Sequence, residues 1–142
     1  MKIYKIENHN EIIENEHINR IIRYDMFNPT DGRIKSAAEG IYGKEQGRFY
    51  VCEKEHIVGL IGVRRVDNAF VEIMHLAVDE PYRKQGIARA LVEYVRQSER
   101  VDEIISEADD STVDFYRALD FQIEEELDPV TDVVRFICRL KG

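Results

Sequence analysis

Residues 71 to 90, VEIMHLAVDEPYRKQGIARA, form the stretch that decides the fold. The apolar run VEIMHLAV predicts a strand that ends at the DEP segment, residues 79 to 81. The following RKQGIA, residues 83 to 88, opens a helical pattern. A strand that runs through a basic, glycine-containing turn into a helix N-terminus forms an anion site, because unpaired backbone N–H groups and the positive end of the helix dipole point the same way. The sequence therefore predicts a site for a phosphate or pyrophosphate.

The composition is that of one folded domain. The chain has 142 residues, of which 44% are hydrophobic and 34% charged, as is usual for a globular protein. No apolar run approaches the roughly 20 residues that cross a bilayer, and the N-terminus lacks the apolar segment of a secretory signal, so we expect no membrane partner and a cytoplasmic location. The net charge of −8 argues against nucleic acid, which needs a basic surface. Cys52 and Cys138 fall in apolar runs, and we expect buried thiols rather than a disulfide.

The order of predicted elements is β-α-α-β-β-β-α-β-α-β-β, over one domain of residues 1–142. We expect helices over 11–27, 34–41 and 82–98 and a further helix capped by Asp110 or Ser111, and strands over 1–7, 48–53, 57–66, 69–78, 102–107, 121–127 and 133–140. Asp67-Asn68 predicts a two-residue turn, because both residues tolerate positive φ. This order predicts an α/β (α+β) fold with a mixed, mostly antiparallel sheet of about seven strands, about four flanking helices and one parallel crossover.

Two motifs resemble those of a known family. Arg83-x-x-Gly86-x-Ala88, after a strand that ends in Leu76-Ala77-Val78, is similar to the acetyl-CoA signature of the GNAT superfamily of N-acetyltransferases, usually written Arg/Gln-x-x-Gly-x-Gly/Ala. Residues 114–121, DFYRALDF, resemble the later FYxxxGF block of that family. The motifs occur in the family's order, about 30 residues apart, and the resemblance covers essentially the whole chain. It implies an acyltransferase that moves an acetyl group from acetyl-CoA, as co-substrate, to a primary amine by direct attack in a ternary complex.

The resemblance also implies a cofactor site between two strands that splay apart around the helix that begins near Lys84. The backbone of Gln85, Gly86, Ile87, Ala88 and Arg89 would bind the pyrophosphate, and Gly86 has no Cβ to block the approach. Charge from Arg83, Lys84 and Arg89 would add contacts, including one to the 3′-phosphate. Backbone groups of Leu76, Ala77 and Val78 would pair with the pantetheine arm, and an N–H near Leu76 would bind the developing oxyanion. Read without the family, the same loop is a solvated turn with an incidental glycine.

Tyr116 is the first candidate for a catalytic side chain, because the family usually places a tyrosine here, near the sulfur of the departing thiolate. A thiol with a pKa near 8.5 gives a weaker base than a phenolate with a pKa near 10, so full proton transfer is uphill by roughly 2 kcal/mol. We therefore expect Tyr116 to stabilise the thiolate by a hydrogen bond. The alternative is a core tyrosine with a satisfied hydroxyl group.

Glu72 is the second candidate, since a carboxylate in the middle of an apolar strand is disfavoured unless it is paired or functional. It occupies the strand on which some relatives carry a catalytic glutamate. Glu72 would accept the proton of the acceptor ammonium or bind that cation; pointing to solvent is the alternative. His75 lies three residues further on, so we expect it on the opposite side of the strand, as a packed histidine.

The acceptor side is less determined by the sequence. Tyr24 is expected to contact the substrate, and Arg23, Asp25 and Tyr42 lie where the family commonly shapes its acceptor pocket. Nothing in the sequence decides which of these side chains reach in, or which amine binds. The histidines and cysteines lack ligand spacing, so we expect no metal. Exposed edges at the final strands allow a homodimer.

Two residues depart from the family's pattern and leave alternatives open. Asp120 stands where the family prefers glycine, although aspartate can adopt the left-handed conformation of a helix C-terminus. Asp109 stands about where many relatives have a cofactor-contacting asparagine, so that contact is in doubt. A non-catalytic CoA-binding sensor or interaction module is therefore the alternative function. A helix-turn-helix regulator built on the N-terminal helices conflicts with the acidic charge.

Overall fold

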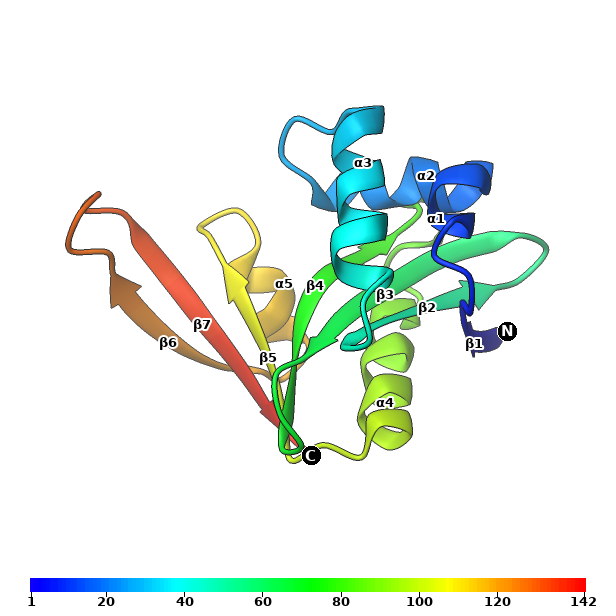
Figure 1. Ribbon diagram of the computed structural model, residues 1–142. Helices are drawn as coiled ribbons and strands as arrows, with labels where there is room; N and C mark the ends of the chain where they lie inside the picture. Colours follow the sequence, from blue (N-terminus) through cyan, green and yellow to red (C-terminus); the bar gives the residue numbers. More distant parts are fainter.

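The computed structural model describes all 142 residues, and its core is a seven-stranded sheet in the order β1-β2-β3-β4-β5-β7-β6. The sheet is antiparallel except for one parallel pair, β4 with β5. The predicted fold class is confirmed (Figure 1). The strands are β1 Lys2–Lys5, β2 Gly47–Glu53, β3 Ile57–Arg65, β4 Phe70–Val78, β5 Glu103–Ala108, β6 Gln122–Leu127 and β7 Val134–Lys141.

Helices flank the sheet in the predicted order. The helices are α1 Glu11–Glu14, α2 Glu16–Ile22, α3 Asp31–Ala37, α4 Ile87–Glu99 and α5 Val113–Ala118, with short 3-10 turns η1 Arg23–Asp25 and η3 Glu80–Tyr82 and a π-helical turn η2 Ala38–Tyr42. None of them is both long and apolar enough to span a bilayer.

Strands β4 and β5 pair only over a short length and then diverge. Their register runs from Phe70 opposite Glu103 to Glu72 opposite Ile105. Beyond that point β4 continues to Val78 with no partner on this side, while β5 pairs with β7 along its full length. Figure 1 shows β5, β6 and β7 leaning away from the other strands. The splay implied by the family resemblance is therefore present.

A β-bulge in β4 lies where the splay begins. Gly62 of β3 is opposite His75, whereas the next residue, Val63, is opposite Ile73, so Met74 has no partner. An extra residue reverses the alternation of side chains along the rest of a strand. Ile73 and Leu76, three residues apart, consequently share one hydrophobic cluster on the same face of the sheet.

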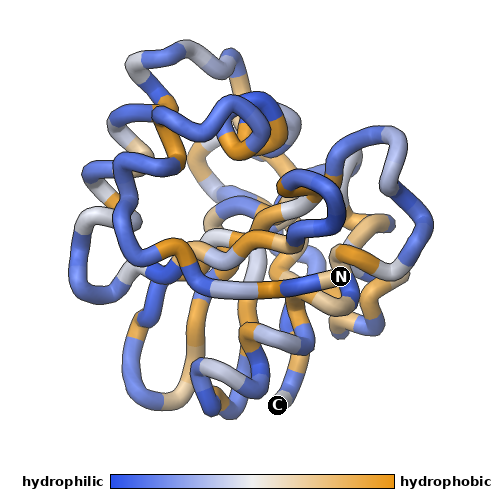
Figure 2. Tube along the Cα trace, turned by 90° about the vertical axis from the view of Figure 1, so that its right-hand side faces the viewer, coloured by the Kyte–Doolittle hydropathy of each residue, from blue (hydrophilic) through white to orange (hydrophobic).

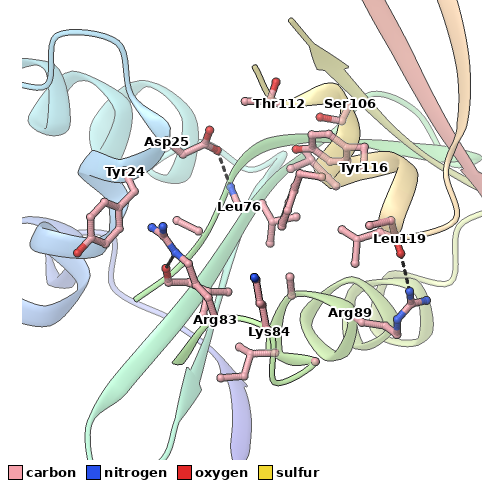
Figure 3. Close-up of a pocket in the computed structure, with 18 of the residues that line it drawn as sticks. Tyr24, Asp25, Leu76, Arg83, Lys84, Arg89, Ser106, Thr112, Tyr116 and Leu119 are labelled. Atoms are coloured by element: carbon pink, nitrogen blue, oxygen red, sulfur yellow. Dashed lines mark hydrogen bonds between the residues drawn. The ribbon is translucent and has the colours of Figure 1, made fainter. Parts of the chain in front are cut away.

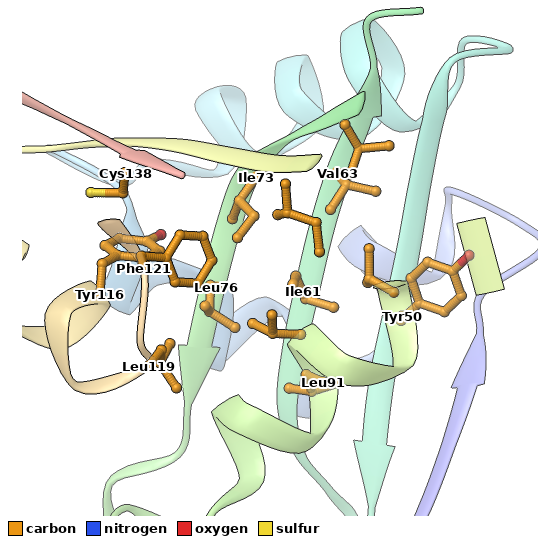
Figure 4. Close-up of a cluster of buried hydrophobic side chains, with 14 of the residues drawn as sticks. Tyr50, Ile61, Val63, Ile73, Leu76, Leu91, Tyr116, Leu119, Phe121 and Cys138 are labelled. Carbon is orange, nitrogen blue, oxygen red and sulfur yellow. The ribbon is translucent and has the colours of Figure 1, made fainter. Parts of the chain in front are cut away.

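Each face of the sheet has its own hydrophobic core. On one face α4 packs through Leu91 and Val95, both fully buried, within a cluster of 21 buried residues (Figure 4). On the other face the N-terminal helices contribute Ile18 and Ile34 to a cluster of 13. Complete burial of one such aliphatic side chain contributes roughly 2 kcal/mol, so both layers hold the sheet. The hydropathy of the chain follows this arrangement, with hydrophobic segments inside and hydrophilic loops outside (Figure 2).

Two local details, in the N-terminal helices and in the turn between β3 and β4, differ from the sequence predictions. The predicted helix 11–27 is broken at Asn15, whose side chain accepts hydrogen bonds from the N–H groups of His17 and Ile18 and caps α2. The expected positive-φ turn at Asp67-Asn68 is wrong, because neither residue has positive φ. Instead the Asp67 carboxylate accepts bonds from the N–H groups of Ala69 and Phe70, which satisfies the loop without a left-handed residue.

Candidate functional site

A cavity of about 610 Å³ opens where β4 and β5 separate. Its walls come from η1, the end of β4, the start of α4, β5 and α5, so residues far apart in sequence meet there (Figure 3). All the site residues expected from the sequence line it except Glu72 and Gln85: Tyr24, Leu76, Ala77, Val78, Arg83, Lys84, Gly86, Ile87, Ala88, Arg89 and Tyr116. The structure thus gathers both motifs around one space.

The N-terminus of α4 lies at this cavity without a cap. Gly86 precedes the helix with φ +81°, a left-handed conformation, and no side chain caps the helix or places an acid in its first turn. The N–H groups of Ile87, Ala88 and Arg89 belong to that first turn, which has no partners within the helix. A Cβ on Gly86 would meet no atom within 4 Å. Within the protein, backbone conformation rather than lack of space therefore requires glycine here.

The three basic residues around the start of α4 have different surroundings. Arg83 donates from Nε to the Val78 carbonyl oxygen at 3.0 Å and stacks on the Tyr24 ring, 4.9 Å from its centroid. Arg89 donates to the Asp120 carboxylate at 2.9 Å and also to a carbonyl oxygen at the end of α5. Lys84 forms no hydrogen bond or ion pair through its side chain, and it extends from the loop toward the cavity (Figure 3). Lys84 is thus the cation that an anionic ligand meets without breaking an existing contact.

Tyr116 forms part of the wall contributed by α5. It is buried, with its ring in edge contact with Phe115 and Phe121 at centroid distances of 5.4 and 5.3 Å. Its hydroxyl group lies beside Ser106 of β5 (Figure 3). Burial raises the pKa of Tyr116 well above its usual value. The phenol therefore keeps its proton at neutral pH and is suited to donate a hydrogen bond, as expected from the sequence.

Asp25, at the end of η1, contacts the splayed part of β4 directly. Its Oδ2 accepts a hydrogen bond from the Leu76 N–H at 2.7 Å (Figure 3). Burial raises the pKa of Asp25 to about 6, although the bond from Leu76 acts in the opposite direction. The sequence placed Asp25 near the acceptor pocket without a role. No sequence signal links it to Leu76, because the two residues are 51 positions apart.

Glu72 is not among the residues of the cavity. It forms an ion pair with Arg64 of the neighbouring strand, at 2.6 Å between Nη2 and Oε1. His75 is buried, as expected, with Nδ1 2.5 Å from the Tyr42 hydroxyl group. Burial lowers the pKa of His75 to about 4, so its ring is neutral. The expectation that Glu72 and His75 face opposite sides is wrong, since the bulge at Met74 places both on the face of the N-terminal helices.

The two departures from the family's pattern have structural roles. Asp120 adopts φ +68° after α5, as its predicted tolerance of the left-handed region allows, and its carboxylate is the partner of Arg89. Asp109 accepts bonds from the N–H and hydroxyl groups of Ser111 and Thr112, which holds the turn before α5. The N-cap expected at Asp110 or Ser111 is consequently displaced to Thr112. Both cysteines are buried and free.

Comparison with known proteins agrees with this arrangement. A family model described as an acetyltransferase (GNAT) domain matches residues 45–123, more than half of the chain. This chain belongs to the GNAT acetyltransferase family. An uncharacterised N-acetyltransferase from the lysA 3′ region of Bacillus methanolicus is 36% identical over 74 residues, which span 49% of this chain and 62% of that relative.

Solved structures of GNAT proteins share the fold along the whole chain. The aminoglycoside 6′-N-acetyltransferase from Enterococcus faecium has a TM-score of 0.75 and 17% identity, with 99% of this chain and 97% of that chain covered. A GNAT family acetyltransferase from Elizabethkingia anophelis with acetyl-CoA bound has a TM-score of 0.68 and 15% identity, with the same coverage. The GNAT model covers the α4 loop and Tyr116, whereas Tyr24 and Asp25 lie before it. The wall formed by η1 is therefore the part of the cavity that the family match does not describe.

Proposed function

We propose that this GNAT domain is an N-acetyltransferase that moves the acetyl group of acetyl-CoA to a primary amine by direct attack, with both substrates bound together. The observation that carries the proposal is the uncapped start of α4, which lines the same cavity as Tyr116. Backbone N–H groups and the helix dipole suit a pyrophosphate, and Lys84 adds a charge-assisted contact. Acetyl-CoA supplies the activated acetyl group as co-substrate.

The remaining residues of the cavity have roles that follow from their chemistry. Beyond Glu72 the β4 edge lacks a neighbouring strand, so its backbone can pair with the amides of the pantetheine arm as an added strand would. Two of these groups have protein partners already, the Leu76 N–H and the Val78 carbonyl. Tyr116 donates a hydrogen bond to the departing thiolate, because its raised pKa disfavours loss of the proton itself.

In this proposal the acceptor amine binds on the η1 side of the cavity. Tyr24 is half exposed there, and the Asp25 carboxylate bonds to the unpaired part of β4 at the Leu76 N–H. A carboxylate in this position favours a cationic acceptor. A polyamine, an aminoglycoside, an amino acid and a lysine side chain all present such a group. Glu72, held by Arg64 outside the cavity, has no part in the proposed reaction.

The proposal is tested by calorimetry with coenzyme A and by thiol release from acetyl-CoA in the presence of an amine panel. The panel contains spermidine, an aminoglycoside, glycine and a lysine-containing peptide. We expect binding, and thiol release that requires an amine. Lys84→Ala should weaken coenzyme A binding by about 5- to 30-fold, the loss of one charge-assisted contact. The matched control Lys44→Ala removes an exposed lysine away from the cavity and should leave binding unchanged.

Two results would contradict the proposal. If the folded protein binds no coenzyme A, the assignment of the cavity to this ligand is wrong. Binding without thiol release on any amine would instead favour a sensor that holds the nucleotide.

A further inference from the structure

The contact between Asp25 and the Leu76 N–H leads to an inference about the acceptor's proton. An alkyl ammonium is not a nucleophile, so one proton must leave the nitrogen before it attacks a thioester. The group that receives it has to line the cavity and be ionised at neutral pH. Two carboxylates line the cavity, Asp25 and Glu107. Glu107 lies on β5, with its side chain half exposed and 3.7 Å from the Arg135 guanidinium.

Asp25 differs from Glu107 in position and in partners. It is partly buried, has no cationic partner, and its one hydrogen bond comes from the backbone of the unpaired edge of β4. The same N–H of Leu76 is the donor expected to bind the thioester oxygen. When the thioester binds, its oxygen takes over this N–H, and the Asp25 carboxylate is released beside the position where the carbonyl carbon would be attacked. Resting on the proposed acetyltransferase function, we infer that Asp25 is the catalytic base that takes the proton from the acceptor's ammonium group.

The proposed step conserves atoms and charge. The ammonium gives one proton to the Asp25 carboxylate, and the neutral nitrogen forms a bond to the thioester carbon. The carbon–sulfur bond then breaks, and its electron pair leaves with the sulfur as a thiolate that accepts the hydrogen bond of Tyr116. The second proton of the nitrogen ends on the sulfur, and Asp25 returns its own proton to solvent.

The surroundings of Asp25 suit this role. Burial raises the pKa of Asp25 to about 6, so the side chain is mostly ionised at pH 7 and yet a stronger base than an ordinary aspartate by about 100-fold. The titratable groups that act on it are Tyr42, Tyr116 and Asp109. Both tyrosines have raised pKa values and stay neutral, and hydrogen bonds from Ser111 and Thr112 keep the pKa of Asp109 low. His75, bonded to Tyr42, has a pKa of about 4.

The test is Asp25→Asn, because asparagine keeps an oxygen for the Leu76 N–H and loses the ability to take a proton. The turnover number is measured from pH 5 to 9 with the fastest acceptor of the amine panel, and with a fluorinated analogue of that amine whose nitrogen is uncharged at pH 7. Wild-type turnover should fall as the pH drops through about 6, where Asp25 becomes protonated. Glu72→Gln is the matched comparison, a carboxylate changed to its amide outside the cavity.

We expect Asp25→Asn to lower turnover of the basic amine at pH 7 by about 100-fold or more, to remove the decline near pH 6, and to leave coenzyme A binding within a factor of about three. The uncharged analogue should lose far less, since it needs no base for deprotonation. Equal losses on both amines, or a decline near pH 6 that persists in Asp25→Asn, would overturn the inference. So would the loss of that decline in Glu72→Gln. Wild-type protein that transfers no acetyl group would overturn the proposed function and this inference together.

Discussion

Two explanations for the glycine at position 86 predict opposite effects of substitution. One is the backbone conformation that glycine permits, and the other is the close approach of the ligand. In the structure the φ of Gly86 is +81°, and a Cβ would meet no protein atom within 4 Å. An alanine forced into the left-handed region is destabilised by about 1–2 kcal/mol, whereas asparagine visits that region at lower cost. If backbone conformation is what the site needs, Gly86→Asn should therefore be the milder change. If close approach of the ligand is what matters, the larger asparagine should be the more damaging one.

The conformational strain in Gly86→Ala can lower either the stability of the fold or the affinity for coenzyme A. When Gly86→Ala keeps the native backbone, the strain appears as lost stability and coenzyme A affinity is unchanged. When the loop relaxes to negative φ, stability recovers, but the ligand must restore the strained conformation and its dissociation constant rises by about 5- to 30-fold for 1–2 kcal/mol. We expect the two losses together to equal about 1–2 kcal/mol in Gly86→Ala, and a few tenths in Gly86→Asn.

Urea unfolding and calorimetry with coenzyme A measure these two losses. We add the free energy lost in stability to that lost in affinity. The sum should be smaller for Gly86→Asn than for Gly86→Ala. An asparagine variant that binds coenzyme A more weakly than the alanine variant would refute the conformational argument. Unaltered stability and unaltered affinity in Gly86→Ala would show that the positive φ carries no strain.

Two further predictions concern Tyr116 and Asp79. Tyr116→Phe should lower turnover by about 10- to 100-fold, the value of one hydrogen bond to a charged sulfur, while calorimetric coenzyme A affinity stays within about twofold; equal losses in turnover and affinity would mean that the tyrosine is structural. Burial alone would raise the pKa of Asp79, but its bonds to Arg20 outweigh burial and hold the pKa below its usual value. Asp79 therefore stabilises the fold above about pH 4 and loses this contribution as the pH falls further through its lowered pKa. Wild type should be more stable than Asp79→Asn at pH 7 by about 1 kcal/mol, and the gap between their melting temperatures should narrow steadily below about pH 4; a gap that does not narrow on acidification would contradict the ionic origin.

The parts of the fold that could be predicted from the sequence depend on local patterns. The helix after Gly86 and the strand before it follow from hydrophobic periodicity and from a single loop. The strand and the end of the helix lie where expected, whereas the helix begins at Ile87 rather than near residue 82. Tyr116 lines the same cavity as the start of α4, and its motif is a local pattern as well. Asp120 departs from the glycine that the family prefers at this position. It nevertheless adopts the left-handed conformation that the turn requires, and its carboxylate pairs with Arg89.

The parts that could not be predicted depend on contacts between distant segments. The bond from Leu76 to Asp25 joins residues 51 positions apart, and no pattern in either segment announces it. The same holds for Glu72, because its ion pair with Arg64 depends on the register of β3 with β4. The break at Asn15 is not visible in the sequence for another reason. The apolar spacing continues across the two helices that it separates, and the capping side chain is one polar residue among several.

The unpaired residue Met74 has a consequence for how this chain can change. Because β4 reverses its alternation there, Leu76 and Val78 face α4 only as long as the additional residue is present. Loss of one codon between Ile73 and Leu76 would turn apolar side chains of the strand's second half toward the wrong helices, and would move the Asp25 contact with them. Substitutions at this point change a side chain, whereas a deletion would exchange the two buried faces over half of the strand. Insertions and deletions, rather than replacements, are therefore what this segment excludes.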